Sequence, residues 1–387
     1  MSMVAILAAV FILAVPTLAS SCSIPLPLAS MENDNIHSVT HSPPARGRLL
    51  EHELFWRDHY DWLLSNGFQL RDRYKPNWKP SWEGTKKPSI LCTDGLLQPH
   101  PSVLDAERQS NAEIGQYFST SSVASDKHNH CIPIYDVLQV PDNDDLVILV
   151  MPFLRPHDDP AFDTIGEAVE FFSQVFEGLQ FMHQHHVAHR DVAYLNVLMD
   201  ANPLFVDRYH PSRLDYKLDM SGPAKHYTRT QKPVKYYLTD FGLSRKYNAE
   251  NLPVSEDVIF GADKTVPEFK SMKACNPFPT DVYTLGNMIR EQFIEGSSLA
   301  SRKFGFEFMK PLVADMTQVD PSKRPTMDAV VQRFDKLRSG LGTWKLRSRV
   351  VDEKESYLKR VVRGVDHWKR RIWWTLRRVP PLPSPRT

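Results

Sequence analysis

The chain has 387 residues, and its 42% hydrophobic and 11% aromatic content is enough to bury a sizeable core, which excludes an intrinsically disordered protein. The formal net charge is +1, but residues 344–387 carry thirteen lysines and arginines against four acidic residues. The rest of the chain is therefore acidic, and the basic tail has no recognisable nucleic-acid fold, so no nucleic-acid partner is expected.

The first segment in chain order, residues 1–20, is apolar. It holds no charge from Met3 to Ala19 and ends in small residues that resemble a signal cleavage site. These features predict a signal peptide or a membrane anchor, and a membrane-associated or secretory location. No Lys or Arg precedes the apolar run and the chain has no Asn-x-Ser/Thr sequon, so the alternative is a gene-model or disordered extension on a cytoplasmic protein. The Ser/Pro-rich residues 21–48 are predicted to be a linker.

The next elements are a helix and a pair of strands. Residues 53–65 have apolar side chains at helical spacing, and Asn66-Gly67 supplies a turn that ends them. Residues 131–140 and 145–154 are apolar, β-branched runs on either side of a turn-forming Pro-Asp-Asn-Asp. They predict two antiparallel strands.

A long helix and two short strands follow. Thr164 and Glu167 have capping-box spacing, and the apolar residues after them lie on one face, as a helix packed on a core requires. Residues 197–200 and 235–239 are predicted to be short strands. The 34 residues between them, 201–234, contain four prolines and are predicted to form a surface insertion.

Two short motifs next to these elements carry oxygen-bearing side chains. The sequence His189–Asp191 follows the long helix and stands five residues before Asn196, and Asp240–Gly242 follows the second short strand. Carboxylate and amide oxygens are suitable ligands for Mg²⁺, which keeps its other positions for water and phosphate. An aspartate within hydrogen-bond reach of a hydroxyl can accept its proton. The pattern therefore favours a magnesium-phosphate site.

These motifs resemble those of the eukaryotic protein kinase superfamily, and the resemblance extends in the expected order over about residues 130–340. Val266–Glu268 resembles the end of the activation segment, and Asp281–Gly286 resembles the buried helix beneath the catalytic loop. Arg324 resembles the arginine that pairs with Glu268.

The resemblance implies a two-lobed α+β fold. The small, mostly β N-lobe is expected at residues 49–152 and the larger, mainly helical C-lobe at residues 153–341, followed by a basic amphipathic tail at residues 342–387. The implied cofactors are ATP and Mg²⁺, and the implied partner is a protein substrate.

The resemblance also assigns catalytic roles. Asp191 would accept the proton of the substrate hydroxyl, while Asn196 and Asp240 would hold Mg²⁺. His189 would pack the loop, and Arg190 would receive a phosphate from the activation segment.

Nucleotide contacts are implied in the same way. Met151 and Phe153 would lie beside the adenine, and Leu198 would close the pocket from below. For each of these apolar residues taken alone, an ordinary place in the core is the alternative. Glu113 is the candidate for the glutamate that pairs with a small-lobe lysine, with Glu107 as the second choice.

The phosphate-binding parts of the small lobe are missing. No Gly-x-Gly-x-x-Gly occurs, and no lysine lies between residues 88 and 126. Arg108 stands only five residues before Glu113, so we expect it on the same helix and not on the preceding strand. Lys86 and Lys87 are the nearest substitutes, in a turn-like stretch. In the catalytic loop, Ala193 and Tyr194 stand where the family usually has a Lys or Arg before the Asn.

The expected function is therefore a protein-kinase-like phosphotransferase of impaired efficiency, which moves the γ-phosphate of ATP to a Ser, Thr or Tyr hydroxyl. The alternative is a pseudokinase that binds nucleotide and partner proteins without turnover. A shortened gene model across residues 82–113 would also explain the missing parts. A phosphotransferase for small molecules is a third option, which the kinase-like motifs at residues 266–268 and 281–286 disfavour.

Two further features lie near the motifs. The activation segment contains Ser255 and Thr265, and we hypothesise that one of them is phosphorylated and docks on Arg190; the alternative is solvated hydroxyls with no role. A histidine cluster between residues 183 and 189 raises the alternative of a zinc site, which the absence of an acidic or Cys ligand beside it disfavours.

The tail has two binding motifs of its own. Residues 356–378 place apolar residues at three- and four-residue spacing among Lys and Arg, which predicts a basic amphipathic helix. It suits an anionic membrane surface or a helix-binding groove, and the alternative is that it packs on the large lobe. Residues 377–383 have the spacing of a ligand for a polyproline-binding domain.

Overall fold

The computed structural model describes residues 49–95, 104–141, 143–298 and 300–385. The chain divides into two units. The first holds the described residues up to Asp105 together with Tyr209–Pro223, and the second holds the remaining described residues. This division differs from the predicted lobes at 49–152 and 153–341, because the strands between residues 131 and 154 belong with the helices of the second unit.

The predicted signal or anchor segment, residues 1–20, and the predicted linker, residues 21–48, lie outside the described residues. Within the ranges that the structure describes, no helix is long and apolar enough to cross a membrane.

The first unit is built from short helices and turns. From residue 49 to residue 95, the structure has helices but no strand, so the mostly β character expected for a small lobe is absent from this stretch. Prolines at positions 76, 80 and 88 interrupt the chain and explain the lack of longer elements. The elements of this unit are α1 (Glu51–Asp58), α2 (Tyr60–Ser65), the 3₁₀ turns η1 (Asp72–Tyr74) and η2 (Ser89–Leu91), and the antiparallel pair β7 (Tyr209–His210) and β8 (Arg213–Lys217).

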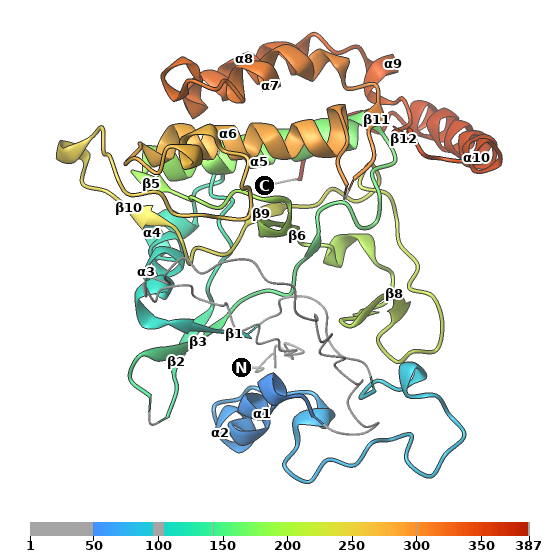
Figure 1. Cartoon of the computed structure of the whole chain (residues 1–387). Coiled ribbons are helices and arrows are strands. Elements are labelled where there is room, and N and C mark those ends of the chain that lie inside the picture. Colours follow the sequence, from blue (N-terminus) through green and yellow to red (C-terminus); the bar gives the residue numbers. More distant parts are fainter. Residues whose placement is uncertain (1–48, 96–103, 142, 299, 386–387) are drawn as a thin grey trace, which may run out of the picture. The chain divides into compact units, whose positions relative to one another are not determined.

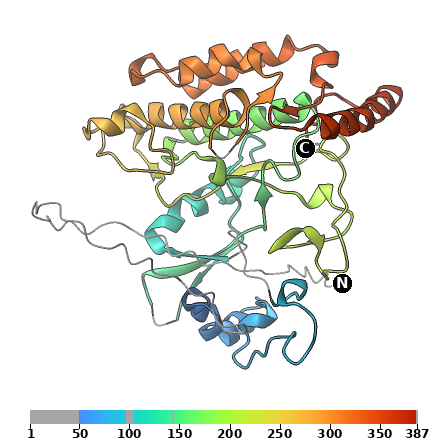
Figure 2. The same ribbon diagram turned by 45° about the vertical axis from the view of Figure 1, so that its right-hand side comes forward.

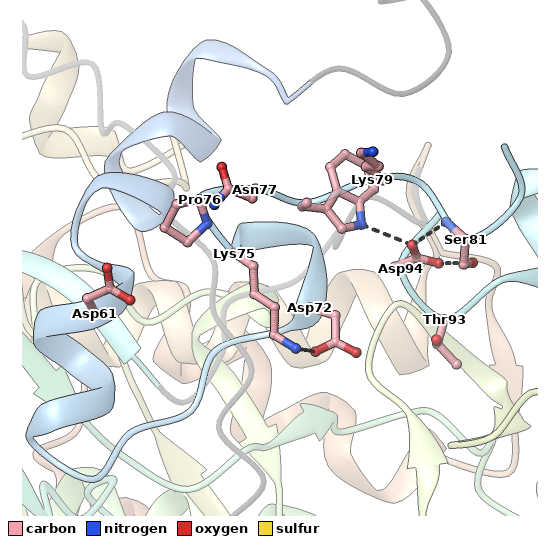
Figure 3. Close-up of a pocket in the computed structure, with 10 residues that line it drawn as sticks. Asp61, Asp72, Lys75, Pro76, Asn77, Lys79, Ser81, Thr93 and Asp94 are labelled. Carbon is pink, nitrogen blue, oxygen red and sulfur yellow. Dashed lines mark hydrogen bonds and ion pairs between the residues drawn. The ribbon is translucent and has the colours of Figure 1, made fainter.

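Buried charges hold the first unit together. Arg73 pairs with Glu53 at 2.8 Å, with both side chains almost fully buried, and donates to the carbonyl of Asp94 at 2.9 Å. The Asp94 carboxylate accepts hydrogen bonds from Trp78 Nε1 at 3.0 Å and from the Ser81 N–H at 2.8 Å (Figure 3). Trp78, Ser81 and Asp94 are among the residues that border a hollow of about 640 Å³.

The second unit begins with a three-stranded sheet in the order β1-β3-β2. The predicted antiparallel strands are confirmed as β2 (Asp136–Gln139) and β3 (Leu146–Val150), with Asp136 opposite Val150. The strand β1 (Leu104–Arg108) leads directly into α3 (Gln109–Phe118). Ala112 of α3 packs on Val147 and Leu149 of β3, which places the helix on one face of the sheet.

A second sheet, β4-β6-β9, supports the motifs. It is formed by β4 (Arg155–Pro156), β6 (Val197–Met199) and β9 (Tyr236–Leu238), in antiparallel register. The short strands predicted at residues 197–200 and 235–239 are therefore confirmed. The other short elements of this unit are α4 (Ser121–Ala124), β5 (Val187–Ala188), η3 (Tyr194–Asn196), η4 (Asn202–Leu204), β10 (Arg245–Lys246), η5 (Ala249–Asn251), η6 (Pro267–Lys270), a π-helical turn η7 (Arg290–Ile294), β11 (Lys303–Phe304), η8 (Glu307–Met309), η9 (Pro321–Lys323) and β12 (Val351–Asp352).

The helices of the second unit form a layered group around α5 (Ile165–Gln184) (Figure 1). Thr164 caps α5 by accepting the N–H of Glu167 at 3.1 Å, as its spacing predicts, and most of the helix is buried. The other helices are α6 (Pro277–Ile289), α7 (Lys310–Met316), α8 (Met327–Ser339), α9 (Thr343–Leu346) and α10 (Tyr357–Leu376). α5 contacts α8 and α9, and α10 lies at one end of this group (Figure 2).

A buried ion pair ties the end of the activation segment to this group. The guanidinium of Arg324 donates to both carboxylate oxygens of Glu268, at 2.6 and 2.7 Å. The Arg324 side chain is fully buried, and the same group donates to the carbonyl of Pro279 in α6. The pairing that the sequence resemblance implies is therefore present, in the bidentate geometry that makes such pairs strong.

Candidate active site

The loop His189–Asn196 is anchored by a buried carboxylate, the first residue of the Asp281–Gly286 motif. Asp281, in α6, is fully buried and accepts the backbone N–H of His189 at 2.8 Å and that of Arg190 at 2.6 Å. It also accepts a hydrogen bond from His183 Nε2 at 3.0 Å. Arg190 has a positive φ of 67°, which is strained for a non-glycine residue, and the two anchored N–H groups hold the loop in this shape.

Asp191 and Asn196 meet within this loop. The amide nitrogen of Asn196 donates to the backbone carbonyl of Asp191 at 2.9 Å and to its Oδ2 at 3.1 Å. Asp191 Oδ1 accepts the backbone N–H of Ala262, in the activation segment, at 2.6 Å. A side chain at Gly261 would collide with Asp191, so a glycine is needed for this close approach. Each carboxylate oxygen accepts up to two hydrogen bonds, so both retain room for a substrate hydroxyl.

Asp240 is held next to Asn196 by the β6–β9 ladder. The N–H of Thr239 donates to the carbonyl of Asn196 at 2.9 Å, and the Thr239 carbonyl accepts a hydrogen bond from His189 Nε2 at 3.1 Å. Asp240 itself has φ of 60° and an exposed side chain, whose Oδ1 accepts the N–H of Gly242 at 3.2 Å. The structure thus brings Asp191 and Asn196 into contact and places Asp240 directly after Thr239, whose N–H is bonded to Asn196.

Phe241 packs under this site and turns Asp240 outward. Its ring is 7% exposed and lies 6.3 Å from the ring of Phe118 in α3 and 5.7 Å from that of His189, centre to centre. A side chain at Gly115 would come within 3.5 Å of the Phe241 ring. Helix α3 therefore packs directly on the motif that carries the proposed metal ligand.

Glu113 lies on the exposed side of the same helix. It lines a hollow of about 370 Å³ with Gln116 of α3 and with Val137, Gln139 and Val147 of the sheet. No lysine is among the residues that line this hollow in the part of the chain that the structure describes. The role of Glu113 as a partner for a small-lobe cation stays a prediction.

Arg108 is not on the same helix as Glu113, which corrects the expectation from the sequence. It is the last residue of β1, and α3 begins at Gln109. A spacing of five residues fits one helix, but here the strand runs up to the helix without a loop. Arg108 therefore ends the strand β1, which lies beside β3.

Two of the residues predicted to line the adenine pocket follow β3, and the third lies in β6. Met151 packs, partly buried, against the cluster formed by α3 and β3, and Phe153 is partly buried between β3 and β4. Leu198, in β6, lies opposite Pro156 of β4 and is also partly exposed. Partial exposure is compatible with a binding surface, and their contact with a nucleotide stays a prediction.

Arg190 already has an anionic partner in the activation segment. Glu256 accepts contacts from Arg190 at 3.4 Å, from Arg245 at 2.8 Å and from the hydroxyl of Tyr247 at 2.7 Å. Burial raises the pKa of Tyr247 and the hydrogen bond to Glu256 raises it further, so this hydroxyl stays a donor. The side chain of Arg190 therefore contacts a carboxylate here, and the docking of a phosphate on Arg190 stays a prediction.

The two hydroxyls considered for phosphorylation lie elsewhere. Ser255 is exposed beside Glu256, while Thr265 Oγ1 donates to Asp263 Oδ1 at 2.7 Å and accepts from Asn287 at 3.2 Å. Three histidines of the alternative zinc site also have separate partners. His185 contacts the carbonyl of Phe181, His183 contacts the Asp281 carboxylate, and His189 contacts the carbonyl of Thr239.

Comparison with known proteins agrees with this geometry. The model of the protein kinase domain family matches residues 106–303, just over half of the chain. A mitogen-activated protein kinase kinase kinase 1a from Physcomitrium patens is 24% identical over 179 residues, which cover 42% of this chain and 19% of that protein. The serine/threonine-protein kinase SIK2 from Gallus gallus is 24% identical over 221 residues, which cover 53% of this chain and 24% of that protein.

The match thus spans no more than about a quarter of either relative's length. The residues matched by the family model include the catalytic loop, the Asp240 motif and the activation segment. The helices and small antiparallel sheets described above have the mixed α+β character of that domain. The chain therefore belongs to the protein kinase domain family.

Proposed function

We propose that this chain is a protein kinase that transfers the γ-phosphate of ATP to a Ser, Thr or Tyr hydroxyl of a protein. The observation that carries the proposal is the convergence of Asp191, Asn196 and Asp240 through two contacts, the Asn196–Asp191 hydrogen bond and the Thr239–Asn196 ladder bond. Typical members of the family use ATP and Mg²⁺, and we propose the same cofactors here.

The donor set fits a hard cation. Asn196 uses its amide nitrogen toward Asp191, so its Oδ1 is left for a metal, and Asp240 offers an exposed carboxylate. Bound Mg²⁺ would neutralise phosphate charge. Asp191 would accept the proton of the substrate hydroxyl, and Asp281 would keep it in position through the backbone of the loop.

Reduced efficiency follows from the missing cations. Ala193 leaves the catalytic loop without its usual Lys or Arg, and no Gly-x-Gly-x-x-Gly motif is present to cradle the phosphates. The alternative function is a pseudokinase, favoured by the same absences.

A transfer assay on the full chain tests the proposal. With MgATP labelled at the γ-phosphate and a mixture of Ser, Thr and Tyr peptides, we expect slow, magnesium-dependent labelling of peptide that stops when EDTA is added. The names of the two relatives favour Ser and Thr acceptors. Nucleotide binding without any labelling over hours would reject the kinase and leave the pseudokinase.

For partners we propose a protein substrate. For location we propose a membrane surface or the secretory pathway, with the cytoplasm as the alternative.

The polyproline-ligand motif at residues 377–383 has a different use in this chain. Pro383 is buried, Arg347 donates to the carbonyl of Val379 at 2.6 Å, and Ser384 donates to Glu170 of α5 at 2.9 Å. A binding domain would have to remove this segment from α5 first, so we do not propose it as a partner.

A further inference from the structure

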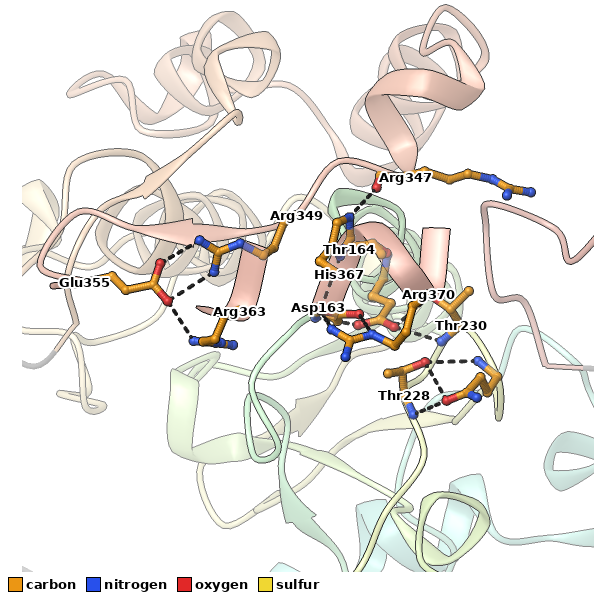
Figure 4. Close-up of polar contacts among 12 residues, drawn as sticks. Asp163, Thr164, Thr228, Thr230, Arg347, Arg349, Glu355, Arg363, His367 and Arg370 are labelled. Atoms are coloured by element: carbon orange, nitrogen blue, oxygen red, sulfur yellow. Dashed lines mark hydrogen bonds and ion pairs between the residues drawn. The ribbon is translucent and has the colours of Figure 1, made fainter. Parts of the chain in front are cut away.

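Helix α10 is attached to the second unit through its polar side. Asp163, just before α5, accepts two hydrogen bonds from Arg370 at 2.8 and 3.1 Å and lies 3.5 Å from His367 (Figure 4). His367 also contacts the carbonyl of Arg347 at 2.9 Å. Burial raises the pKa of Asp163, but the hydrogen bonds from His367 and Arg370 outweigh it and hold this pKa below its ordinary value, so Asp163 stays ionised.

A second set of contacts holds the same side. Glu355 pairs with Arg349 at 2.7 Å and with Arg363 of α10 at 3.2 Å (Figure 4). The guanidinium of Arg371 lies 3.6 Å from the ring centre of Trp344, and Trp374 is 1% exposed. His367, Arg371 and Trp374 are spaced by four and three residues, so one narrow face of α10 makes the attachment.

The opposite face of α10 is apolar and exposed. The stripe consists of seven residues at three- and four-residue spacing, each between 46% and 78% exposed: Leu358, Val361, Val362, Val365, Trp368, Ile372 and Leu376. A surface helix normally buries its apolar stripe, but α10 leaves this stripe exposed. Contiguous exposed apolar surface of this kind marks an interaction site. The sequence predicted this stripe, and the structure shows that the large lobe does not cover it.

Charges beside the stripe indicate what it binds. Lys359, Lys369, Arg377 and Arg378 are exposed around it, while the only exposed acidic residue of α10 is Asp366, 3.5 Å from Lys369. Trp344 of α9 is 69% exposed, and its ring lies 5.9 Å from that of Trp368, so it extends the apolar surface. An apolar stripe edged by cations and tryptophans is the composition of helices that lie in the interface of an anionic bilayer.

We propose that the exposed stripe of α10 docks on an anionic lipid surface, with the helix axis parallel to the bilayer. The 20 residues of α10 give a contact about 30 Å long. The attachment through Asp163 and Glu355 keeps the stripe facing outward, so binding requires no rearrangement of the helix. The surface shares no residue with the nucleotide site, so the proposal stands or fails separately from the proposed function.

Vesicle sedimentation of the full chain tests this docking. The probes are phosphatidylcholine vesicles with and without about 30% phosphatidylserine, which makes the surface strongly anionic. We expect the wild type to sediment with the anionic vesicles only. The double variant Val362→Glu/Ile372→Glu is expected to bind at least about tenfold more weakly. It removes apolar area that docking would bury in the bilayer, and its negative charges are repelled by the anionic lipid. Lys359→Gln is expected to weaken binding about fivefold, as does Lys369→Gln.

The matched control is Val319→Glu, which places the same charge at an apolar residue that is 74% exposed outside α10, and should bind like the wild type. All the substituted side chains are exposed, so folding is retained, and circular dichroism verifies it. Equal binding by the double variant and the wild type would overturn the proposal, as would absence of wild-type binding. A wild-type dimer that light scattering shows to dissociate in the double variant, without vesicle binding, would overturn it in favour of a second copy of the chain.

Discussion

Replacing Asp191 by Asn is expected to lower the rate of phosphoryl transfer about a hundredfold or more, because an amide cannot accept the proton of the substrate hydroxyl. The fold should persist. The substituted amide can still present an oxygen to the amide nitrogen of Asn196, and it loses only the hydrogen bond from Ala262, which is worth about 1 kcal/mol. Steady-state transfer rates at saturating MgATP measure the effect.

The matched control for this variant is Asp335→Asn. Asp335 is an aspartate on the surface of α8 whose ion pair with Arg338 is half exposed and contributes little to stability. Its transfer rate should equal that of the wild type. A transfer rate in Asp191→Asn within twofold of the wild type would show that another group accepts the proton, and would remove Asp191 from the catalytic role.

Replacing Glu256 by Gln is expected to loosen the activation segment and to lower the transfer rate about tenfold, without any change in phosphorylation. The Arg190 side chain is only 10% exposed, and the change leaves its charge without a partner. Removing one member of a fully buried ion pair costs about 3–5 kcal/mol, and because Glu256 is partly exposed we expect about 2 kcal/mol. Thermal unfolding and protease cleavage between residues 243 and 265 measure the loss.

Glu250→Gln is the control, since Glu250 is an exposed glutamate of the same segment. It should leave both the unfolding temperature and the cleavage rate unchanged. If Glu256→Gln is as resistant to protease as the wild type, the carboxylate does not order the segment.

Much of the second unit could be predicted because its signals are local. The strands β2 and β3 follow from two apolar runs around a turn, and the start of α5 follows from the spacing of Thr164 and Glu167. The site residues Asp191, Asn196 and Asp240 could be named from their motifs, which stand next to a predictable helix or strand. Their convergence needs only the short ladder between β6 and β9.

The features that sequence reasoning missed depend on contacts between distant residues. The Asp281–Gly286 motif predicts a buried helix under the loop, but not that the Asp281 carboxylate holds two backbone N–H groups about ninety residues away along the chain. Glu256 pairs with Arg190 across 66 positions and has no local signal. The five-residue spacing predicts Arg108 on the helix of Glu113, because nothing in the sequence marks the change from strand to helix at Gln109. In α10 the amphipathic pattern identified the apolar stripe correctly, but the ion pairs of Asp163 and Glu355 decide which face the lobe covers.

Asn196 and Asp240 are expected to hold Mg²⁺ and, through it, the nucleotide. Calorimetric titration of the full chain with MgATP tests this. We expect binding that requires Mg²⁺ and that weakens at least about tenfold in Asp240→Asn, because a metal-bound carboxylate is lost, while Asp335→Asn binds like the wild type. Binding that is unaffected by EDTA, equal affinity in Asp240→Asn, or no binding to the folded wild type would contradict the account.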